Sequence, residues 1–216
     1  NSHKGVARFT FFTRCLNQKA QKLPWAFHCE DLSLHDNKNQ TFNDMKKTTI
    51  ETLASTNVFE IIGKEWMLIT AGNLQKFNMM TASWGGIGWL WNKPVAFIFV
   101  RPERYTYPLI EENEHLTLSF LGHDPAMREV YNFCGTKSGR DFDKAVETGL
   151  LPVETEHGSV TFEQARLTIE GRKLFRSEFT PEEFLDKTLL ERWYNDKPGG
   201  SLHTMYIVEI ENVYES

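Results

Sequence analysis

Short apolar segments recur along the chain from Met45 onward, and glycine, proline and polar turn signals separate them. Apolar runs of this length, bounded by Gly or Pro, are typical of buried strands. The segments that fit this pattern are 65–71, 94–100, 116–121 and 204–210, with a less regular alternation over 165–169. The pattern therefore predicts at least five strands.

Helical periodicity is local and confined to four segments. Apolar and acidic positions predict helices over 106–113 and 125–133. A third helix is expected over 142–148, with a cap at Ser138 and a terminating glycine at 149, and a fourth from Pro181 toward Trp193. Because strands and helices do not alternate, the predicted fold class is mainly β, a β-barrel with peripheral helices.

Composition limits the function classes. The chain has 216 residues, 40% of them hydrophobic and 25% charged, which suits one main globular domain. A net charge of −5 without a basic face disfavours nucleic acid as a partner. No apolar run approaches the roughly 20 residues of a membrane span, and three scattered cysteines form no disulfide framework. We therefore expect a cytoplasmic protein with reduced thiols and no membrane partner.

Residues 1–44 differ in composition from the rest of the chain. They carry six Lys or Arg against four Asp or Glu, whereas residues 45–216 carry 18 against 25. They also hold Cys15, Cys29, His28 and His35, but no spacing typical of a metal site. We predict a boundary near Met45, with 1–44 an N-terminal extension, either non-native or read from upstream, and no metal site.

One chemistry-bearing block follows a predicted strand and precedes two glycines. Thr81, Ala82, Ser83 and Trp84 combine small and polar side chains, so backbone amides and hydroxyls there could approach a flat ligand. The alternative is a plain strand followed by a glycine turn. Phosphate-loop, dinucleotide, zinc-protease and hydrolase motifs are absent from the sequence.

Two further blocks carry cations. Arg101 and Arg104 precede Tyr105 and Thr106 at a predicted strand-to-helix junction, where guanidinium and hydroxyl donors can bind an anion. Lys137 and Arg140 surround Ser138-Gly139 at an apparent helix start, a second anion candidate. Surface arginines on a turn are the alternative for the first pair.

Two isolated residues, Cys134 and His203, are further candidates for a functional site. Cys134 has no partner cysteine or nearby histidine, so we interpret it as a small, partly buried residue and not a redox nucleophile. His203 is the one histidine placed near a site, with a structural role as the alternative.

Together these blocks resemble the flavin reductase-like FMN-binding split-barrel family, and within it the flavoredoxin-type branch. The resemblance spans residues 45–216 and leaves out 1–44. The segments that carry it are GKEWMLITAG at 63–72, FNMMTASWGGIG at 77–88, WNKPVAFIFVRPERYTY at 91–107, LTLSF at 116–120, FCGTKSGRDFDKAVETGL at 133–150 and HTMYIVEIENV at 203–213.

The resemblance implies a six-stranded split barrel that forms a homodimer, with FMN at the subunit interface. It places the ring and ribityl chain against the first block and the phosphate near the later cations. The implied FMN-binding residues are Asn78, Thr81, Ala82, Ser83, Trp84, Arg101, Arg104, Tyr105, Thr106, Lys137, Ser138, Gly139 and Asp141.

The implied function is an NAD(P)H-dependent flavin reductase-type oxidoreductase, with NADH or NADPH as reductant and FMN N5 as hydride acceptor. The alternative is a flavoredoxin-like electron-transfer protein whose FMN is reduced by a redox partner protein. A flavin-free β-barrel module is a third reading. Because the flavin supplies the chemistry, no catalytic residue is named.

Overall fold

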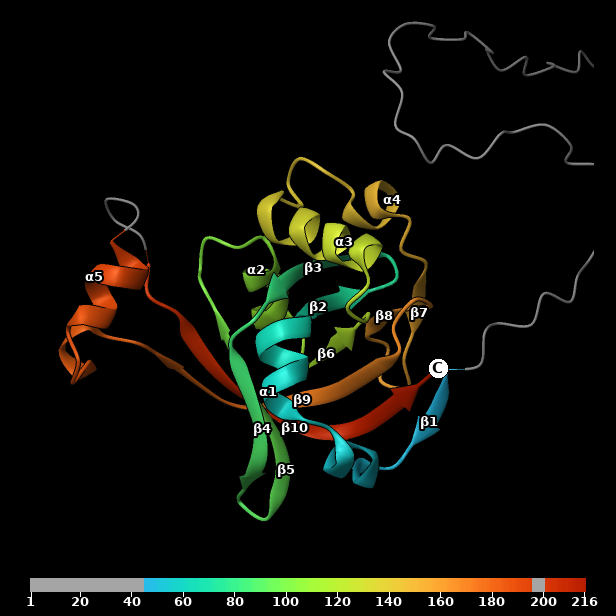
Figure 1. The fold of residues 1–216 in the computed structure, drawn as a ribbon, viewed down its shortest axis with the longest axis horizontal. Coiled ribbons are helices and arrows are strands. Elements are labelled where there is room, and N and C mark those ends of the chain that lie inside the picture. Colours follow the sequence, from blue (N-terminus) through green and yellow to red (C-terminus); the bar gives the residue numbers. More distant parts are fainter. Residues whose placement is uncertain (1–44, 196–200) are drawn as a thin grey trace, which may run out of the picture. The chain divides into compact units, whose positions relative to one another are not determined.

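The computed structural model describes residues 45–195 and 201–216, and Figure 1 shows how their elements are arranged. An eight-stranded antiparallel sheet dominates the fold. Its strands are β1 (Lys46–Thr48), β2 (Met67–Asn73), β3 (Lys76–Ala82), β4 (Gly85–Leu90), β5 (Lys93–Val100), β6 (His115–Phe120), β9 (Leu167–Glu178) and β10 (Thr204–Glu215). A separate ribbon pairs β7 (Pro152–Glu154) with β8 (Val160–Phe162).

Helices are short and surround the sheet. They are a 3₁₀ turn η1 (Ile50–Ser55), α1 (Val58–Glu60), a π turn η2 (Ile61–Glu65), α2 (Thr106–Glu112), α3 (Pro125–Thr136), α4 (Lys144–Thr148), a 3₁₀ turn η3 (Pro181–Glu183) and α5 (Thr188–Tyr194). In Figure 1, α3 and α4 lie beside each other over β2 and β3, and α5 lies at the end of the long β9 and β10 ribbons.

The strand order brings the two ends of the sheet together. The order is β3-β2-β6-β9-β10-β5-β4, with β1 paired to β10, and every pairing is antiparallel. The terminal strands β3 and β4 are separated in the chain by only Ser83 and Trp84. A methyl group on Gly85 would lie 3.2 Å from the Met67 side chain of β2. The sheet therefore curls into a barrel, and the mainly β prediction is confirmed.

Two hydrophobic cores hold the described fold. One fills the barrel interior with buried side chains from β2, β5, β6, β9 and β10, among them Ile69, Ile98, Phe120 and Tyr206. The other lies between the outer face of β2 and β3 and the α3, α4 and β8 layer, and centres on Tyr131 and Phe162. β2 is buried on both faces, so its sequence is a continuous apolar run rather than an alternating one.

The predicted helix over 142–148 is corrected at its start. It begins at Lys144, because the Asp143 carboxylate accepts hydrogen bonds from the backbone N–H groups of Ala145 and Val146. Ser138 is therefore not its cap. The expected glycine terminator is confirmed, since Gly149 has a left-handed φ of 70°.

The predicted helix from Pro181 toward Trp193 is wrong as one element. It is split into η3 and α5, because the Asp186 side chain accepts from both the backbone N–H and the hydroxyl of Thr188, at 3.0 and 2.6 Å. Such local side-chain bonds compete with helical ones. The glycine turn offered as the alternative for residues 81–86 is also wrong, because Ser83 and Trp84 link the two strands and Gly85 and Gly86 begin β4.

Two expectations are not addressed by these elements. The boundary near Met45 and the proposed extension, including its cysteines and histidines, fall on residues outside the described ranges. In the part that the structure describes, no helix is long and apolar enough to cross a membrane.

Gly171 of β9 is predicted to be essential for packing against β10. A methyl group there would lie 2.3 Å from the Glu209 carbonyl oxygen and 2.7 Å from Val208 Cγ1. Gly171→Ala should therefore lower the free energy of unfolding by about 1–3 kcal/mol, as measured by urea denaturation. Gly63→Ala is the control, because nothing lies within 4 Å of its added methyl, and it should change stability by less than about 1 kcal/mol. Equal effects of the two substitutions would contradict the prediction.

Candidate functional site

A cavity of about 530 Å³ opens between β3, the turn that joins β5 to α2, and the loop after α3. This volume lies within the range of small-molecule sites. Twelve of the thirteen residues named from the sequence line it. They are Asn78, Thr81, Ala82, Ser83, Trp84, Arg101, Arg104, Tyr105, Thr106, Lys137, Ser138 and Gly139.

Asp141 is the exception. It lines a neighbouring hollow of about 440 Å³ that shares Asn78, Tyr105 and Gly139 with the main cavity. Its backbone N–H donates to the Ser138 carbonyl at 3.1 Å, which closes the turn after α3. Asp141 therefore shapes the loop from outside the main cavity.

Direct hydrogen bonds join the three segments that form the wall. Asn78 of β3 donates through Nδ2 to Thr106 Oγ1 of α2 at 2.7 Å, and both residues are buried. Thr81 of β3 donates through its hydroxyl to the Tyr131 carbonyl of α3 at 2.5 Å. Neither bond is local in sequence, so the wall forms only when the whole fold forms.

Gly139 allows the third segment to approach. A methyl group at this position would lie 2.0 Å from Asn78 Oδ1 and 2.8 Å from Tyr105 Cδ1. Only glycine therefore lets the loop after α3 meet β3 and the β5–α2 turn. This close packing is the reason why the residue between Ser138 and Arg140 is a glycine.

The cavity lining is strongly cationic. It contains five cationic side chains, Arg101, Arg104, Lys137, Arg140 and Lys144, and a single carboxylate, Glu103. Backbone carbonyls position two of the arginines: Arg104 donates to Gly135 O at 2.8 Å, and Arg140 donates to Glu103 O at 3.2 Å. An anionic group is the complement of such a lining.

Sequence reasoning missed several lining residues, namely Met80, Phe99, Glu103, Thr136 and Lys144, and Lys144 is the most consequential of them. Its Nζ is buried and donates to the carbonyls of Met79 in β3 and Cys134 in α3, at 2.9 and 2.7 Å. Burial, together with a smaller effect of the positive charge of Arg104, lowers the pKa of Lys144 to about 8. In the sequence, Lys144 stands out only as the first residue of a short helix, directly after the capping Asp143. A solvent-exposed lysine could occupy the same position, so the sequence does not reveal that Lys144 is buried.

An aromatic group lines one part of the cavity and extends beyond it. Trp84 lies with its ring centroid 5.2 Å from Trp193 of α5 and 5.3 Å from His203. Tyr194 shares a hydrogen bond of 2.8 Å with His203 Nδ1, and the Arg101 guanidinium lies 5.0 Å from the Tyr194 ring centre. His203 lines the cavity together with the residues named from the sequence, and Trp193, which was not predicted, lies against Trp84.

His203 is neutral near pH 7. Burial lowers its pKa to about 4, and the charge of Arg101 acts in the same direction. The imidazole therefore adds no charge to the aromatic group, while the Arg101 guanidinium beside Tyr194 does. Such a cavity suits a ligand with a flat body and an anionic tail.

Cys134 does not contribute reactive chemistry. Its thiol is fully buried, and burial raises its pKa to about 11, although Lys144 opposes that shift. A thiol that stays protonated is a poor nucleophile. The interpretation of Cys134 as a packing residue is confirmed.

Comparison with known proteins places this geometry in context. The model of the family described as "Flavin reductase like domain" matches residues 60–216. None of the curated proteins compared with the chain matches it. Solved structures do match, at sequence identities that establish the fold alone.

Three of these structures are informative. An FMN-binding protein from Thermus thermophilus, with bound p-hydroxybenzaldehyde, has a TM-score of 0.53 at 18% identity, over 70% of this chain and 71% of its own. A flavoredoxin from Methanosarcina acetivorans has a TM-score of 0.54 at 20% identity, over 70% and 68%. An NADH:FAD oxidoreductase from Streptomyces globisporus, in complex with NAD and FAD fragments, has a TM-score of 0.50 at 15% identity, over 70% and 74%. The fold is therefore the split barrel of FMN-binding proteins, as predicted.

The buried ammonium of Lys144 predicts a specific pH dependence of stability. Because the folded-state pKa, about 8, lies below the ordinary value of 10.5, the unfolded chain binds more protons between these two pH values. The free energy of unfolding should therefore rise with pH across this window in the wild type, relative to Lys144→Met. Urea denaturation from pH 7 to 10.5 measures the difference.

Lys64→Met is the matched control for this measurement. Lys64 is an exposed lysine paired with Glu60, so the variant keeps Lys144 and should keep the wild-type rise. Parallel pH profiles for Lys144→Met and the wild type would contradict the assignment of a depressed pKa to Lys144.

Proposed function

This chain belongs to the flavin reductase like domain family, and on that basis we propose that it binds FMN in the cavity between β3, the β5–α2 turn and the loop after α3. We propose further that it is an NAD(P)H-dependent oxidoreductase of the flavin reductase type. The observation that carries the proposal is the charge of the lining, with five cations against one carboxylate, together with the aromatic side chains Trp84 and His203 in the same lining.

The residues of the cavity fit the two halves of FMN. Its phosphate complements the guanidinium and ammonium groups of Arg101, Arg104 and Lys137. The small side chains of Ala82 and Ser83 leave the β3 end open to a planar ring. β3 pairs only with β2 in the described sheet, so its other edge presents backbone groups to a heterocycle.

In this assignment the protein's own groups bind and orient, and bound FMN supplies hydride and electron acceptance at N5 of its ring. The Asn78–Thr106 and Thr81–Tyr131 hydrogen bonds keep the wall in one conformation before a ligand arrives. Trp84 packs edge-on against Trp193, which holds its ring in place beside the cavity. No described side chain is required as an acid or base.

The alternative is a flavoredoxin-like electron carrier whose FMN is reduced by a protein partner. The flavoredoxin fold and the NADH:FAD oxidoreductase fold both match this chain, so the fold favours neither. We prefer the reductase because the cavity has an open aromatic end beside Trp84, where a flat nicotinamide could stack.

We also propose that the protein is a homodimer with the cavity at the subunit interface. The resemblance to the split-barrel family is the first support. The second is exposed aromatic surface beside the cavity, where Trp84 and Trp193 contact each other and are 40% and 42% exposed. Aromatic side chains of this size are enriched at the centres of protein interfaces.

Arg101 and Thr81 are predicted to determine FMN affinity. Arg101→Gln removes a charge-assisted partner of the phosphate and should weaken binding about 10- to 100-fold. Thr81→Ala releases β3 from Tyr131 and should weaken binding about tenfold. Quenching of FMN fluorescence on titration with apoprotein measures both dissociation constants.

Arg128→Gln is the matched control for the arginine substitution. Arg128 stacks 4.0 Å from the Trp66 ring centre and lies outside the cavity lining, so its loss should leave FMN affinity unchanged. Normal flavin content in both Arg101→Gln and Thr81→Ala would refute the assigned site.

The choice between reductase and carrier is tested by the absorbance spectrum of FMN-loaded protein under anaerobic conditions. A reductase predicts bleaching of the flavin bands within seconds of adding NADH or NADPH, with a rate that saturates in nucleotide. A carrier predicts no bleaching by either nucleotide but full bleaching by dithionite. A protein that is colourless after FMN is added and unbound flavin is removed by gel filtration would overturn the flavin assignment itself.

A further inference from the structure

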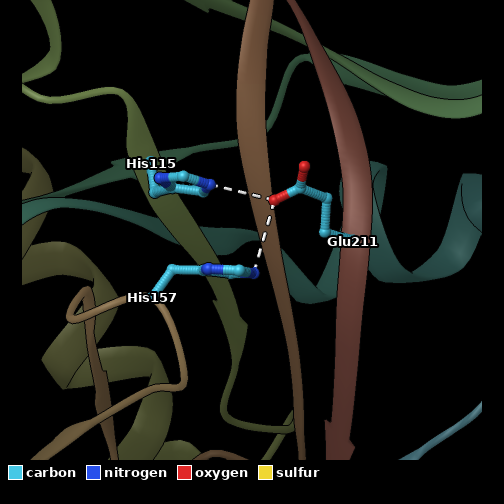
Figure 2. A group of neighbouring side chains, drawn as sticks. All are labelled: His115, His157 and Glu211. Carbon is cyan, nitrogen blue, oxygen red and sulfur yellow. Dashed lines mark hydrogen bonds and ion pairs between the residues drawn. The ribbon is translucent and has the colours of Figure 1, made fainter.

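Three side chains outside the cavity converge on one point of the sheet. Figure 2 shows His115 and His157 aimed at the same carboxylate oxygen of Glu211. His115 Nε2 lies 2.9 Å from Glu211 Oε2, and His157 Nε2 lies 3.5 Å from it. The three potential ligand atoms all lie within 4.8 Å of one another. Neither the cavity nor its neighbouring hollow includes any of these residues.

The cluster gathers residues from three distant segments. His115 begins β6, His157 lies in the turn between β7 and β8, and Glu211 lies in β10. Glu211 has no register partner in β9, because the ladder shifts between Ile210 and Asn212. A β-bulge of this kind re-aims a side chain and is frequent near functional sites.

Hydrogen bonds from neighbouring groups hold the Glu211 carboxylate and the turn that carries His157 in position. Arg172 Nε donates to Glu211 Oε1 at 2.9 Å, which leaves Oε2 free to face the histidines. The backbone N–H of His157 donates to the buried Glu170 carboxylate at 3.1 Å, so the turn that carries His157 is anchored. Hydrogen bonds that orient ligand side chains in this way are characteristic of metal sites.

The electrostatics also suit a cation. Glu209, Glu211 and Glu114 all lie within 4 Å of the Arg172 guanidinium, so the carboxylates around it outnumber its charge.

The present geometry requires one adjustment to admit an ion. The two imidazole rings are stacked with centroids 4.4 Å apart and planes 12° apart, so an ion between them cannot lie in both ring planes. The His157 side chain is 36% exposed and lies on a turn, so its ring can rotate toward the ion. The oxygen-to-nitrogen separations of 2.9 and 3.5 Å bracket the roughly 3.4 Å between ligands of a tetrahedral zinc ion with bonds of about 2.1 Å.

We propose that His115, His157 and Glu211 form a binding site for a borderline divalent transition-metal ion of the zinc class. Two imidazoles and one carboxylate supply three ligands, and water occupies the remaining position. The side chains are 19%, 36% and 23% exposed, so the ion enters directly from solvent. This site is independent of flavin binding.

The test is calorimetric titration of the full chain with Zn²⁺ alone, in a buffer that does not chelate it. The wild type should bind one equivalent that His115→Ala, His157→Ala and Glu211→Gln each weaken at least about tenfold, since even outer-shell substitutions cost about 10- to 100-fold. His157→Ala guards against a folding artefact, because it alters only an exposed turn side chain. Its thermal unfolding midpoint without metal should equal that of the wild type.

Two controls make the result specific. His123→Ala removes another exposed histidine, which lies 3.8 Å from Glu65, and should leave zinc binding unchanged. Titration with Co²⁺ distinguishes this site from the cysteines at 15 and 29, because a His₂–carboxylate site lacks cobalt–thiolate absorption bands. Unchanged zinc binding in His157→Ala, or no zinc binding by the wild type, would overturn the proposal.

Discussion

The shape of the cavity depends on the buried ammonium group of Lys144. Its two hydrogen bonds tie β3 to the end of α3, through Met79 O and Cys134 O. The loop between α3 and α4 is thereby held over β3, where Gly139 packs against Asn78. Both partners of Lys144 are neutral carbonyls, so its charge has no buried counterion there. An anionic ligand in the cavity would supply that countercharge, which couples the stability of the wall to occupancy of the site.

Elsewhere the fold satisfies its buried charges internally. Glu65 is fully buried, pairs with Arg166 through two hydrogen bonds and accepts the Gly122 N–H at 2.7 Å. Glu170 is likewise buried and accepts from Asn212 and Tyr214, at 2.8 and 2.9 Å. Fully hydrogen-bonded carboxylates of this kind fix neighbouring segments in one arrangement. The contrast with Lys144, whose two hydrogen-bond partners are neutral carbonyls, marks the cavity as the place where an external anion belongs.

The sequence allowed the fold class, most strand positions and the lining of the cavity to be predicted, because these follow from local patterns and from the family resemblance. The β5–α2 junction is one example, since Arg101 to Thr106 are contiguous and adopt the predicted strand-to-helix turn. Lys144 could not be predicted, because its role depends on carbonyls 65 and 10 residues away. The helix break before Thr188 was missed because Asp186 also suits a helix N-terminus, and only its hydrogen bonds decide.

The histidine cluster was missed for a related reason. His115, His157 and Glu211 belong to three segments with no common motif, and the bulge that aims Glu211 exists only in the β9–β10 register. A metal motif read from sequence needs ligands at fixed local spacings, which a sheet does not require. When strand pairing brings the residues of a site together, local sequence patterns therefore cannot reveal the site.

The charge of the cavity lining varies little in the physiological range, and this limits the ligands that it can hold. His203 stays neutral above about pH 4, so it adds no charge beside Trp84. The arginines stay charged, with Arg101 against the Tyr194 ring and Arg104 held by the Gly135 carbonyl, and Lys144 adds its charge below about pH 8. A ligand that covered these cations with an uncharged surface would remove water from them without supplying a countercharge. An anionic group on the ligand offsets that cost, so the lining selects for a ligand that carries one.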